Sequence, residues 1–434
     1  MLLQCIVFWS FYVLKVNKIM NKSRSNKDSL KKPRGKFKKP GIDDFHKADP
    51  MPKDVFLRVN KILKNANLFR YIGNKPADSE TALLERDFTK YLGVKYALAL
   101  NSCSSAMFLS LISCGVRPGD KVLVPAFTFT AVPSAIIHAG AVPVLVECNE
   151  RYCIDVDDLR KKISSETKAL LLSHMRGHTA DLERIVKLCK EKNIILIEDA
   201  AHSLGVLWNG QPVGTFGKVG CYSFQSYKII NGGEGGLLVT DDEEIIVKAI
   251  FLSGAYEKMY EKHFVKSKFF ELYKNTLPAF NLRLHNISAA IIRPQIKKIE
   301  DKVAIYNKNY KFLINRLATS KNISIPKIDP RERMAPDSIQ FKLCNLSLKE
   351  AKEFMNKVRD KGVSLYVFGV HEDNARFFWN WKYFQNSFPL EKTRNLLELT
   401  CDMRLPVSFR KVHIDYIADV ILSVLNDIKK NEKN

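Results

Sequence analysis

The sequence lacks three features that would each indicate a different class of protein. Its nine cysteines include no Cys-x-x-Cys pair and stand mostly in apolar stretches, which favours buried free thiols in a reduced chain over a disulfide or zinc framework. No metal site is therefore expected. The apolar segment of residues 1–14 is shorter than the about 20 residues of a membrane-spanning helix, and a signal peptide would carry positive charge before it. No internal repeat is present either, which excludes a repeat architecture.

Acidic residues are few relative to basic ones, with 46 Asp and Glu against 69 Lys and Arg and a formal net charge of +23. Such an excess is typical of proteins that bind nucleic acid, an anionic membrane or an anionic small substrate. Residues 15–39 hold eleven basic residues and one acid, Asp28, so about +10 of the charge lies there. The other 409 residues share +13, and we therefore expect no nucleic-acid partner.

The first part of the chain differs from the rest in composition. Residues 1–52 join the apolar start to a stretch rich in Lys, Ser, Asn, Pro and Gly, which cannot bury enough apolar surface to fold by itself. They are predicted to be a disordered tail on a cytoplasmic protein. Two explanations of the start stay open: contact of residues 1–39 with a membrane, or translation from Met20 or Met51.

The pattern of the remaining residues predicts an α/β fold. Between residues 94 and 253, seven short apolar runs alternate with helix-like stretches, which is typical of a mostly parallel sheet with helices on both faces, a three-layer α-β-α arrangement. After about Arg293 long amphipathic helices and shorter mixed elements follow. We therefore predict a large domain at 53–298 and a smaller C-terminal α/β domain at 299–434. The predicted strands are VKYALALN (94–101), KVLVP (121–125), AVPVLVE (141–147), TKALLLSH (167–174), NIILIED (193–199), KVGCYSF (218–224) and EGGLLVT (234–240).

Polar residues follow the carboxyl ends of several predicted strands, where ligands bind in open α/β sheets. Ser104 and Ser105 open a helical run, so their hydroxyls and the free N–H groups either bind a phosphate or form an ordinary helix cap. Asp199 ends an apolar strand and must pair with a cation, accept several hydrogen bonds or cap the next turn. Lys228 stands before a segment with four glycines in five positions, which permits close backbone approach. Phe129 belongs either to the core or over a flat ligand ring.

These residue types together fit a pyridoxal phosphate site. A lysine amine forms a Schiff base with the cofactor aldehyde, and an acid keeps the pyridine nitrogen protonated so that the ring withdraws electrons. Hydroxyl and amide groups hold the phosphate, and an aromatic face fixes the plane of the ring. Pyridoxal 5'-phosphate is therefore the predicted cofactor.

From about Phe69 onwards the sequence resembles the DegT-type (DegT/StrS) sugar aminotransferase family, a branch of the fold-type I pyridoxal phosphate enzymes. The resemblance implies that family's large domain, built on the predicted three-layer sheet. The motifs that carry it are NSCSSAM (101–107), VLVPAFTFTAVPSAIIHAGAVPVLVE (122–147), IEDAAHSLG (197–205), the segment from SFQSYK to GEGG (223–236), NLRLHNISAAIIRPQIKKI (281–299), and an LPV strand (405–407) followed by a helix at 413–425.

The resemblance implies a role for each matching position. Three residues are implied to be catalytic: Lys228 as the Schiff-base lysine, Asp199 as the partner of the pyridine nitrogen, and His202 against the cofactor near its ring hydroxyl. The further implied cofactor contacts are Ser104, Ser105 and Ser223 at the phosphate, Phe129 on the ring, and Asn231. The segment of Asn231 reaches toward the neighbouring subunit in this family, so the resemblance implies a homodimer with a shared active site.

The substrate side departs from the family in two places. Arg176 stands where the family commonly has an aromatic or apolar residue, so it either brings a cation to the substrate or pairs with an acid at the surface. Tyr227 precedes the lysine where smaller residues are frequent. The resemblance implies Arg283 as a substrate contact, because it matches an Arg of the family's substrate-side motif. Arg176 and His178 are predicted substrate contacts because they are polar residues that follow a predicted strand.

The implied activity is transfer of an amino group from an amino acid, glutamate or glutamine, to a keto-sugar or keto-cyclitol, with a nucleotide-linked acceptor favoured. Such a reaction belongs to saccharide or secondary-metabolite biosynthesis. Related sugar dehydratases carry His in place of the lysine, so Lys228 favours transamination. The alternatives are a pyridoxal phosphate-dependent sugar dehydratase or eliminase on the same fold, and a non-catalytic member that associates with a membrane or nucleic acid.

Overall fold

The computed structural model describes residues 41, 44–371, 373–384 and 389–431. These residues belong to one compact unit that runs from Pro40 to Asn434. Residues 44–52 form no helix or strand, and the first described helix, α2 (Lys53–Asn65), begins where the tail was predicted to end. The predictions for residues 1–39 concern a part outside the described residues, and the division of the remainder at 298/299 stays a prediction.

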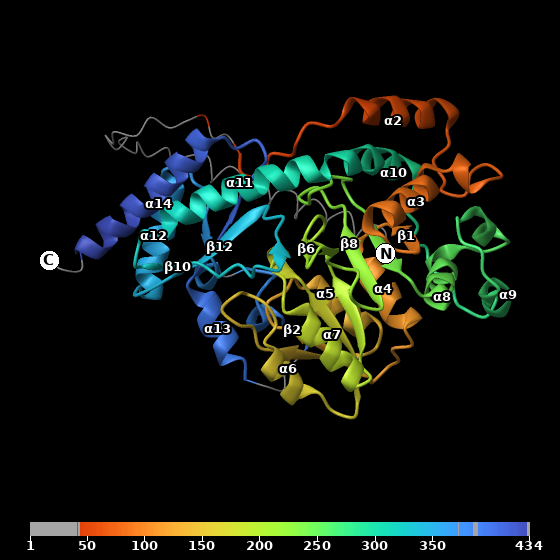
Figure 1. Ribbon diagram of the computed structural model, residues 1–434, viewed down its shortest axis with the longest axis horizontal. Coiled ribbons are helices and arrows are strands. Elements are labelled where there is room, and N and C mark those ends of the chain that lie inside the picture. The colour runs from red at the N-terminus through yellow and green to blue at the C-terminus, as the bar shows by residue number, and fades with distance from the viewer. Residues whose placement is uncertain (1–40, 42–43, 372, 385–388, 432–434) are drawn as a thin grey trace, which may run out of the picture. The chain divides into compact units, whose positions relative to one another are not determined.

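A seven-stranded sheet with the order β1-β9-β8-β5-β4-β2-β3 forms the centre of this unit (Figure 1). Strands β8, β5, β4, β2 and β3 pair in parallel, while β9 is antiparallel to both of its neighbours. All seven strands lie within the predicted runs, so the predicted mostly parallel α/β sheet is confirmed. Their bounds are β1 (Tyr96–Leu100), β2 (Lys121–Pro125), β3 (Val142–Val146), β4 (Thr167–Ser173), β5 (Ile195–Asp199), β8 (Val219–Ser223) and β9 (Gly236–Thr240).

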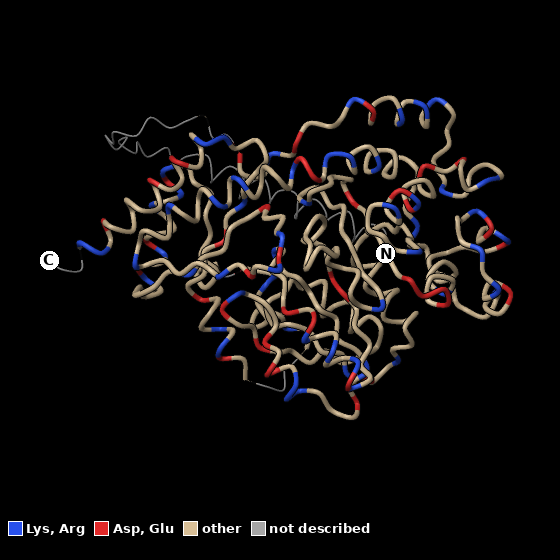
Figure 2. The backbone as a smooth tube through the Cα atoms, viewed as in Figure 1, with Lys and Arg blue, Asp and Glu red and all other residues tan. Residues whose placement is uncertain are grey.

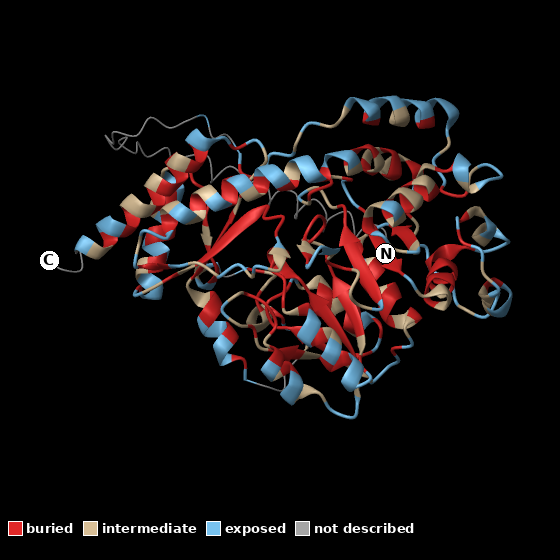
Figure 3. Cartoon of the chain, in the orientation of Figure 1, coloured by how far each residue is buried: buried red, intermediate tan, exposed pale blue. Residues whose placement is uncertain are grey.

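Both faces of the sheet are covered, which explains why its strands read as nearly continuous apolar runs. Alternate residues of β1 enter two different cores: Ala97 and Ala99 pack on one face, and Leu98 and Leu100 on the other. Figure 3 shows the strands buried and the covering helices exposed along their outer sides. The connections between the parallel strands contain α5 (Ala131–His138), α6 (Val156–Lys162) and α7 (Leu182–Glu191), as is usual for parallel strands, which a short hairpin cannot join.

A second sheet is built from the C-terminal part of the chain. Its order is β10-β12-β14-β13, and all its pairs are antiparallel. The strand predicted at 405–407 is misplaced, because β14 ends at Arg404. Leu405 N–H still donates to Asp337 O, at 2.8 Å, but the next residue is Pro406, which has no N–H to extend the ladder. The bounds are β10 (Ile323–Ser324), β12 (Ser338–Leu343), β13 (Tyr366–Val367) and β14 (Thr400–Arg404).

Helix α11 (Ile299–Leu317) connects the two sheets (Figure 1). Ile299 and Val303 in its first turns belong to the core of the large sheet, whereas Leu313 and Leu317 belong to the core of the small one. The other helices are α3 (Glu80–Leu92), α4 (Cys103–Ser113), α8 (Glu243–Gly254), α9 (Phe269–Tyr273), α10 (Asn286–Ile292), α12 (Leu348–Asp360), α13 (Glu391–Glu398) and α14 (Lys411–Asn431).

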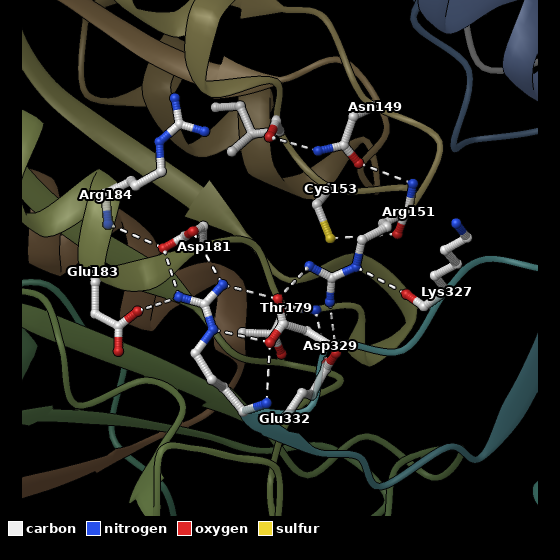
Figure 4. Close-up of polar contacts among 12 residues, drawn as sticks. Asn149, Arg151, Cys153, Thr179, Asp181, Glu183, Arg184, Lys327, Asp329 and Glu332 are labelled. Atoms are coloured by element: carbon white, nitrogen blue, oxygen red, sulfur yellow. Dashed lines mark hydrogen bonds and ion pairs between the residues drawn. The ribbon is translucent and has the colours of Figure 1, made fainter.

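Ion pairs add a second link between the large-sheet part of the chain and the C-terminal part. Glu332, in the short strand β11 (Glu332–Arg333), pairs with Arg151 at 2.9 Å, and Arg331 pairs at 3.1 Å with Asp181, the N-cap of α7 (Figure 4). Glu332 also accepts a hydrogen bond of 3.0 Å from Thr179 N–H. This cluster, together with strands β6 (Leu207–Trp208) and β7 (Gln211–Pro212), fixes the segment between β4 and α7 against the C-terminal part.

The formal net charge of +23 for the whole sequence does not describe how charged residues lie along the described part. In the described residues, Lys and Arg are interspersed with Asp and Glu along the trace (Figure 2). Among these same residues, none of the helices combines the length and apolar character of a membrane span.

A buried ion pair ties the segment after α2 to α3 and the sheet. Arg70 donates two hydrogen bonds, of 2.8 and 3.0 Å, to Glu85 in α3, and Glu85 also accepts the N–H of Ala99 in β1. Burial alone would raise the pKa of Glu85, but Arg70 and His263 outweigh it and hold the pKa at about 2. The pair therefore stabilises the fold fully at pH values above the ordinary pKa of a glutamate. This contribution is lost as the pH falls towards 2.

We predict that Glu85→Gln lowers the free energy of unfolding by about 3–5 kcal/mol, because it leaves the Arg70 charge buried without a counter-charge. The measurement is the shift of the denaturant midpoint. Glu166→Gln is the matched control, since Glu166 pairs with Lys121 at the surface and its loss should cost at most about 1 kcal/mol. Equal shifts for the two variants would contradict the role assigned to the buried pair.

Candidate active site

A cavity of about 410 Å³, here called the Lys228 cavity, opens at the carboxyl ends of the parallel strands. This is where open α/β sheets bind ligands, and the volume lies in the ~300–1,000 Å³ range of small-molecule sites. Most of the predicted site residues line it: Ser104, Phe129, Arg176, Asp199, His202, Ser223 and Lys228.

Asp199 is the last residue of β5, and its carboxylate is fixed from two sides. One oxygen accepts a hydrogen bond of 2.6 Å from Ser173 Oγ, and the other accepts one of 3.1 Å from Ala201 N–H. The preceding residue, Glu198, lies on the opposite face, where it accepts three backbone N–H groups and contacts His174 at 3.1 Å. Strand alternation thus separates a structural carboxylate from one that faces the cavity.

Lys228 lies in the connection between β8 and β9 and contacts His202, with 2.7 Å between Nζ and Nε2. Burial, reinforced by the positive charge of Arg176 and opposed by Asp337, lowers the pKa of Lys228 to about 8. Burial and the neighbouring Lys228 hold the pKa of His202 well below its ordinary value. His202 is therefore neutral and accepts from the ammonium through Nε2, which leaves its proton on Nδ1.

The N-terminus of α4 forms one wall of the cavity. Ser102 caps this helix by accepting the Ser105 N–H at 3.0 Å, so the first-turn N–H groups beside Ser104 have no intrahelical partner. The start of β9 approaches this turn very closely: a Cβ on Gly236 would lie 2.3 Å from Ser102 O. Only glycine permits this approach, which places the glycine-rich segment beside the helix terminus.

Four of the predicted residues lie outside the Lys228 cavity. Ser105 donates to Asn101 at 2.6 Å, and Arg283 donates to Gly254 O at 2.7 Å. Asn231 lines a small neighbouring hollow, where it exchanges hydrogen bonds with Gln295. His178 is buried, contacts Gln340 with 2.7 Å between Nε2 and Oε1, and has its pKa lowered to about 4 by burial.

Arg176 has an unusual backbone conformation and a buried partner. Its φ of 59° lies in the left-handed region, which residues other than glycine, asparagine and aspartate seldom adopt. The guanidinium pairs with Asp402 of β14, and both side chains are almost inaccessible to solvent. Arg176 thus pairs with an acid, as one alternative held, but in the interior and at the wall of the cavity.

Several residues that line the cavity, or that hold the Asp199 carboxylate from behind it, were not predicted. Ser173 pairs in register with Asp199 across β4 and β5, so the end of the predicted strand TKALLLSH already indicated its place. Arg376 and Arg404 come from the C-terminal part, and no local pattern marks them.

The residues present fit pyridoxal phosphate. Asp199 lies where it can pair with a ring nitrogen, Lys228 offers an amine of lowered pKa, and the α4 terminus with Ser104 and Ser223 offers donors to a phosphate. The buried Nδ1 of His202 has no hydrogen-bond partner among the described residues, which leaves it available to a bound oxygen. The described residues contain no group of three or more metal-ligating side chains.

Comparisons with known proteins agree with this assignment. The model of the DegT/DnrJ/EryC1/StrS aminotransferase family matches residues 56–422. GDP-perosamine synthase of Escherichia coli O157:H7 is 33% identical over 247 residues, which cover 55% of this chain and 65% of that protein. UDP-N-acetyl-3-dehydro-alpha-D-glucosamine 3-aminotransferase of Acidithiobacillus ferrooxidans is 30% identical over 260 residues, covering 59% and 64%. The match spans less than two thirds of the length of either relative.

The fold is also shared with solved structures. The aminotransferase from Psychrobacter cryohalolentis superimposes with a TM-score of 0.78 at 22% identity, over 88% of this chain and 100% of that one. This similarity confirms the predicted fold.

The lowered pKa of Lys228 generates a prediction for cofactor uptake. Since only the neutral amine attacks an aldehyde, the rate constant for uptake of pyridoxal phosphate by cofactor-free protein should rise about tenfold per pH unit and level off above about pH 8. Stopped-flow absorbance measures it. A rise that continues to the ordinary lysine pKa of 10.5 would contradict the environment described for Lys228.

Proposed function

Because the chain belongs to the DegT/DnrJ/EryC1/StrS aminotransferase family, we propose that it is a pyridoxal phosphate-dependent aminotransferase. It moves an amino group from an amino acid, glutamate or glutamine, to a keto-sugar or keto-cyclitol. The observation that carries the proposal is the placement of the Lys228 amine and the Asp199 carboxylate in one buried cavity beside a free helix N-terminus.

Lys228 moves the proton in this proposal. Bound pyridoxal phosphate supplies an electron-withdrawing ring that stabilises the electron pair left when a C–H bond beside an amino group breaks. Lys228 would take that proton from the α-carbon of the donor. It would then return the proton to the cofactor carbon that is bonded to the same nitrogen. A pKa of about 8 suits this work, because a general base acts best when its pKa lies near the operating pH.

Asp199 and His202 hold the reacting ring in place. Asp199 keeps a proton at the ring nitrogen, and the Ser173 hydroxyl and the Ala201 N–H stop its carboxylate from turning away. His202 holds Lys228 through Nε2 and has Nδ1–H left to donate to a ring oxygen. Ser104, Ser223 and the α4 terminus hold the phosphate, and Phe129 covers the ring.

The nature of the acceptor is part of the proposal. The two relatives are named for amino sugars carried on GDP and UDP, which supports a nucleotide-linked keto-sugar. Arg176, Arg376 and Arg404 line the cavity and supply cations for an anionic substrate.

The proposal includes a homodimer as the active unit, in the cytoplasm. Phe129 and Tyr227 line the cavity yet are 43% and 47% exposed, and Phe280 nearby is 41% exposed. Apolar side chains exposed together at the mouth of a site are typical of a surface that a second chain covers. The proposed partner is a second copy, and Asn231 and Arg283 are the residues we expect to serve the shared site.

The central variant is Lys228→Ala. With the cofactor in place, we predict a loss of about 10²–10⁴-fold in the rate of amino-group release from glutamate or glutamine, because the variant lacks the amine that carries the proton in this proposal. Single-turnover absorbance of the cofactor measures this half-reaction. Asp199→Asn should lower the same rate while the protein stays folded.

Lys218→Ala serves as the matched control, since Lys218 is exposed, pairs with Asp242 and lies outside the cavity. It should leave the rate unchanged. If the native protein takes up the cofactor but no amino acid converts it to the amine form, transamination is wrong and elimination becomes the better assignment.

A further inference from the structure

A second cavity, of about 440 Å³, adjoins the Lys228 cavity. Its walls include the aromatic side chains of Tyr366 and Phe368 from the C-terminal part. The two cavities share four residues, three of which are cationic: Arg176, Tyr227, Arg376 and Arg404. A molecule that extends from Lys228 into the second cavity must therefore pass these three guanidinium groups.

The three guanidinium groups between the cavities, here called the junction, are not equally neutralised by acidic side chains. Arg176 pairs with Asp402, and Arg404 pairs with Asp337 at 3.4 Å, whereas no ion pair joins Arg376 to any residue that the structure describes. The Nε of Arg376 is also buried without a hydrogen-bond partner. A largely buried cation without a counter-charge is costly, so its retention at the wall of two cavities indicates a ligand of opposite charge.

Arg376 stays charged in this environment. Burial and the neighbouring Arg176, opposed by Asp402, lower the pKa of Arg376 to about 10. That value still lies well above neutrality. The exposed Asp373 lines the second cavity as well, but it forms no ion pair with Arg376.

Arg176 is held in position by a chain of buried polar groups. Asp402 accepts from Gln340 Nε2 at 2.8 Å, and Gln340 Oε1 accepts from His178 Nε2 at 2.7 Å. Because Asp402 is already engaged by Arg176 and Gln340, it is not free to turn toward Arg376. His178 thus acts at a distance, as a positioning residue for the junction.

We propose that Arg376, with Arg176 beside it, binds an anionic group of a substrate whose reacting carbon lies at Lys228. The ligand chemistry is a phosphate or a carboxylate, which a guanidinium binds with two parallel hydrogen bonds. The inference rests on the proposed function, and two sources fit it: a diphosphate on the acceptor, or a carboxylate of the amino-acid donor.

The first experiment measures binding to the cofactor-loaded protein, in which the α4 terminus is already filled. The probes are inorganic pyrophosphate, which stands for the diphosphate, and glutarate, which stands for the donor carboxylates. We expect Arg376→Gln to weaken the binding of one of them at least about tenfold in calorimetry, and Arg376→Lys to restore part of it. Arg184→Gln removes an exposed guanidinium remote from the cavities and should change neither.

The pattern of loss identifies the source. Weaker binding of pyrophosphate alone assigns Arg376 to the acceptor, and weaker binding of glutarate with a raised KM for glutamate assigns it to the donor. If neither probe binds the native protein, or if Arg376→Gln binds both as tightly as the native protein does, the proposal is overturned.

The readout also separates this inference from the proposed function. Probe binding needs no turnover, so a protein that transfers no amino group but loses pyrophosphate binding on Arg376→Gln would contradict only the proposed reaction. Cofactor uptake by Arg376→Gln should equal that of the native protein. If Arg376→Gln fails to take up the cofactor, the binding experiment uses Arg376→Lys instead, because that variant keeps the positive charge and changes only the geometry of the donor groups.

Discussion

The parallel pairing of β4, β5 and β8 determines where the reactive groups of this protein lie. The register sets Ser173 opposite Asp199 and Asp199 opposite Cys221, so three strands end along one edge of the sheet. Parallel strands run in one direction, and their carboxyl ends must therefore meet. The antiparallel strand β9 then returns along β8, which brings the connection with Lys228 over this edge and its Gly236 against the α4 terminus.

The part of the site built by this edge could be predicted from the sequence. Each strand is an apolar run of five to seven residues, and the polar residue after it marks the ligand side. Asp199 and Lys228 follow from that logic because each is close in sequence to a strand end, whereas Ser223 was implied by the family resemblance alone. Where the local pattern was ambiguous, as with Ser104 and Ser105, it could not tell which hydroxyl faces the cavity, since these two residues are adjacent in the first turn of α4 and only Ser105 is engaged with Asn101.

The residues that the C-terminal part contributes to the site could not be predicted, because they reach the site only when that part packs against the large sheet. Arg376, Asp402 and Arg404 lie between 148 and 176 residues after Lys228 in stretches without a motif. The place of His178 could not be predicted for the same reason. Its polar side chain suggested a substrate contact, but it contacts Gln340, which lies in the other sheet. The strand predicted at 405–407 does not form, because Pro406 has no N–H to extend the ladder beyond Leu405.

The central claim is that Lys228 carries the cofactor, and the most direct measurement is the site of covalent attachment. Protein loaded with pyridoxal phosphate is reduced with borohydride, digested and mapped by mass spectrometry. The account predicts a single modified peptide that contains Lys228, in the segment between β8 and β9. Modification at another lysine, or no modification of a protein that is folded and saturated with the cofactor, would contradict it.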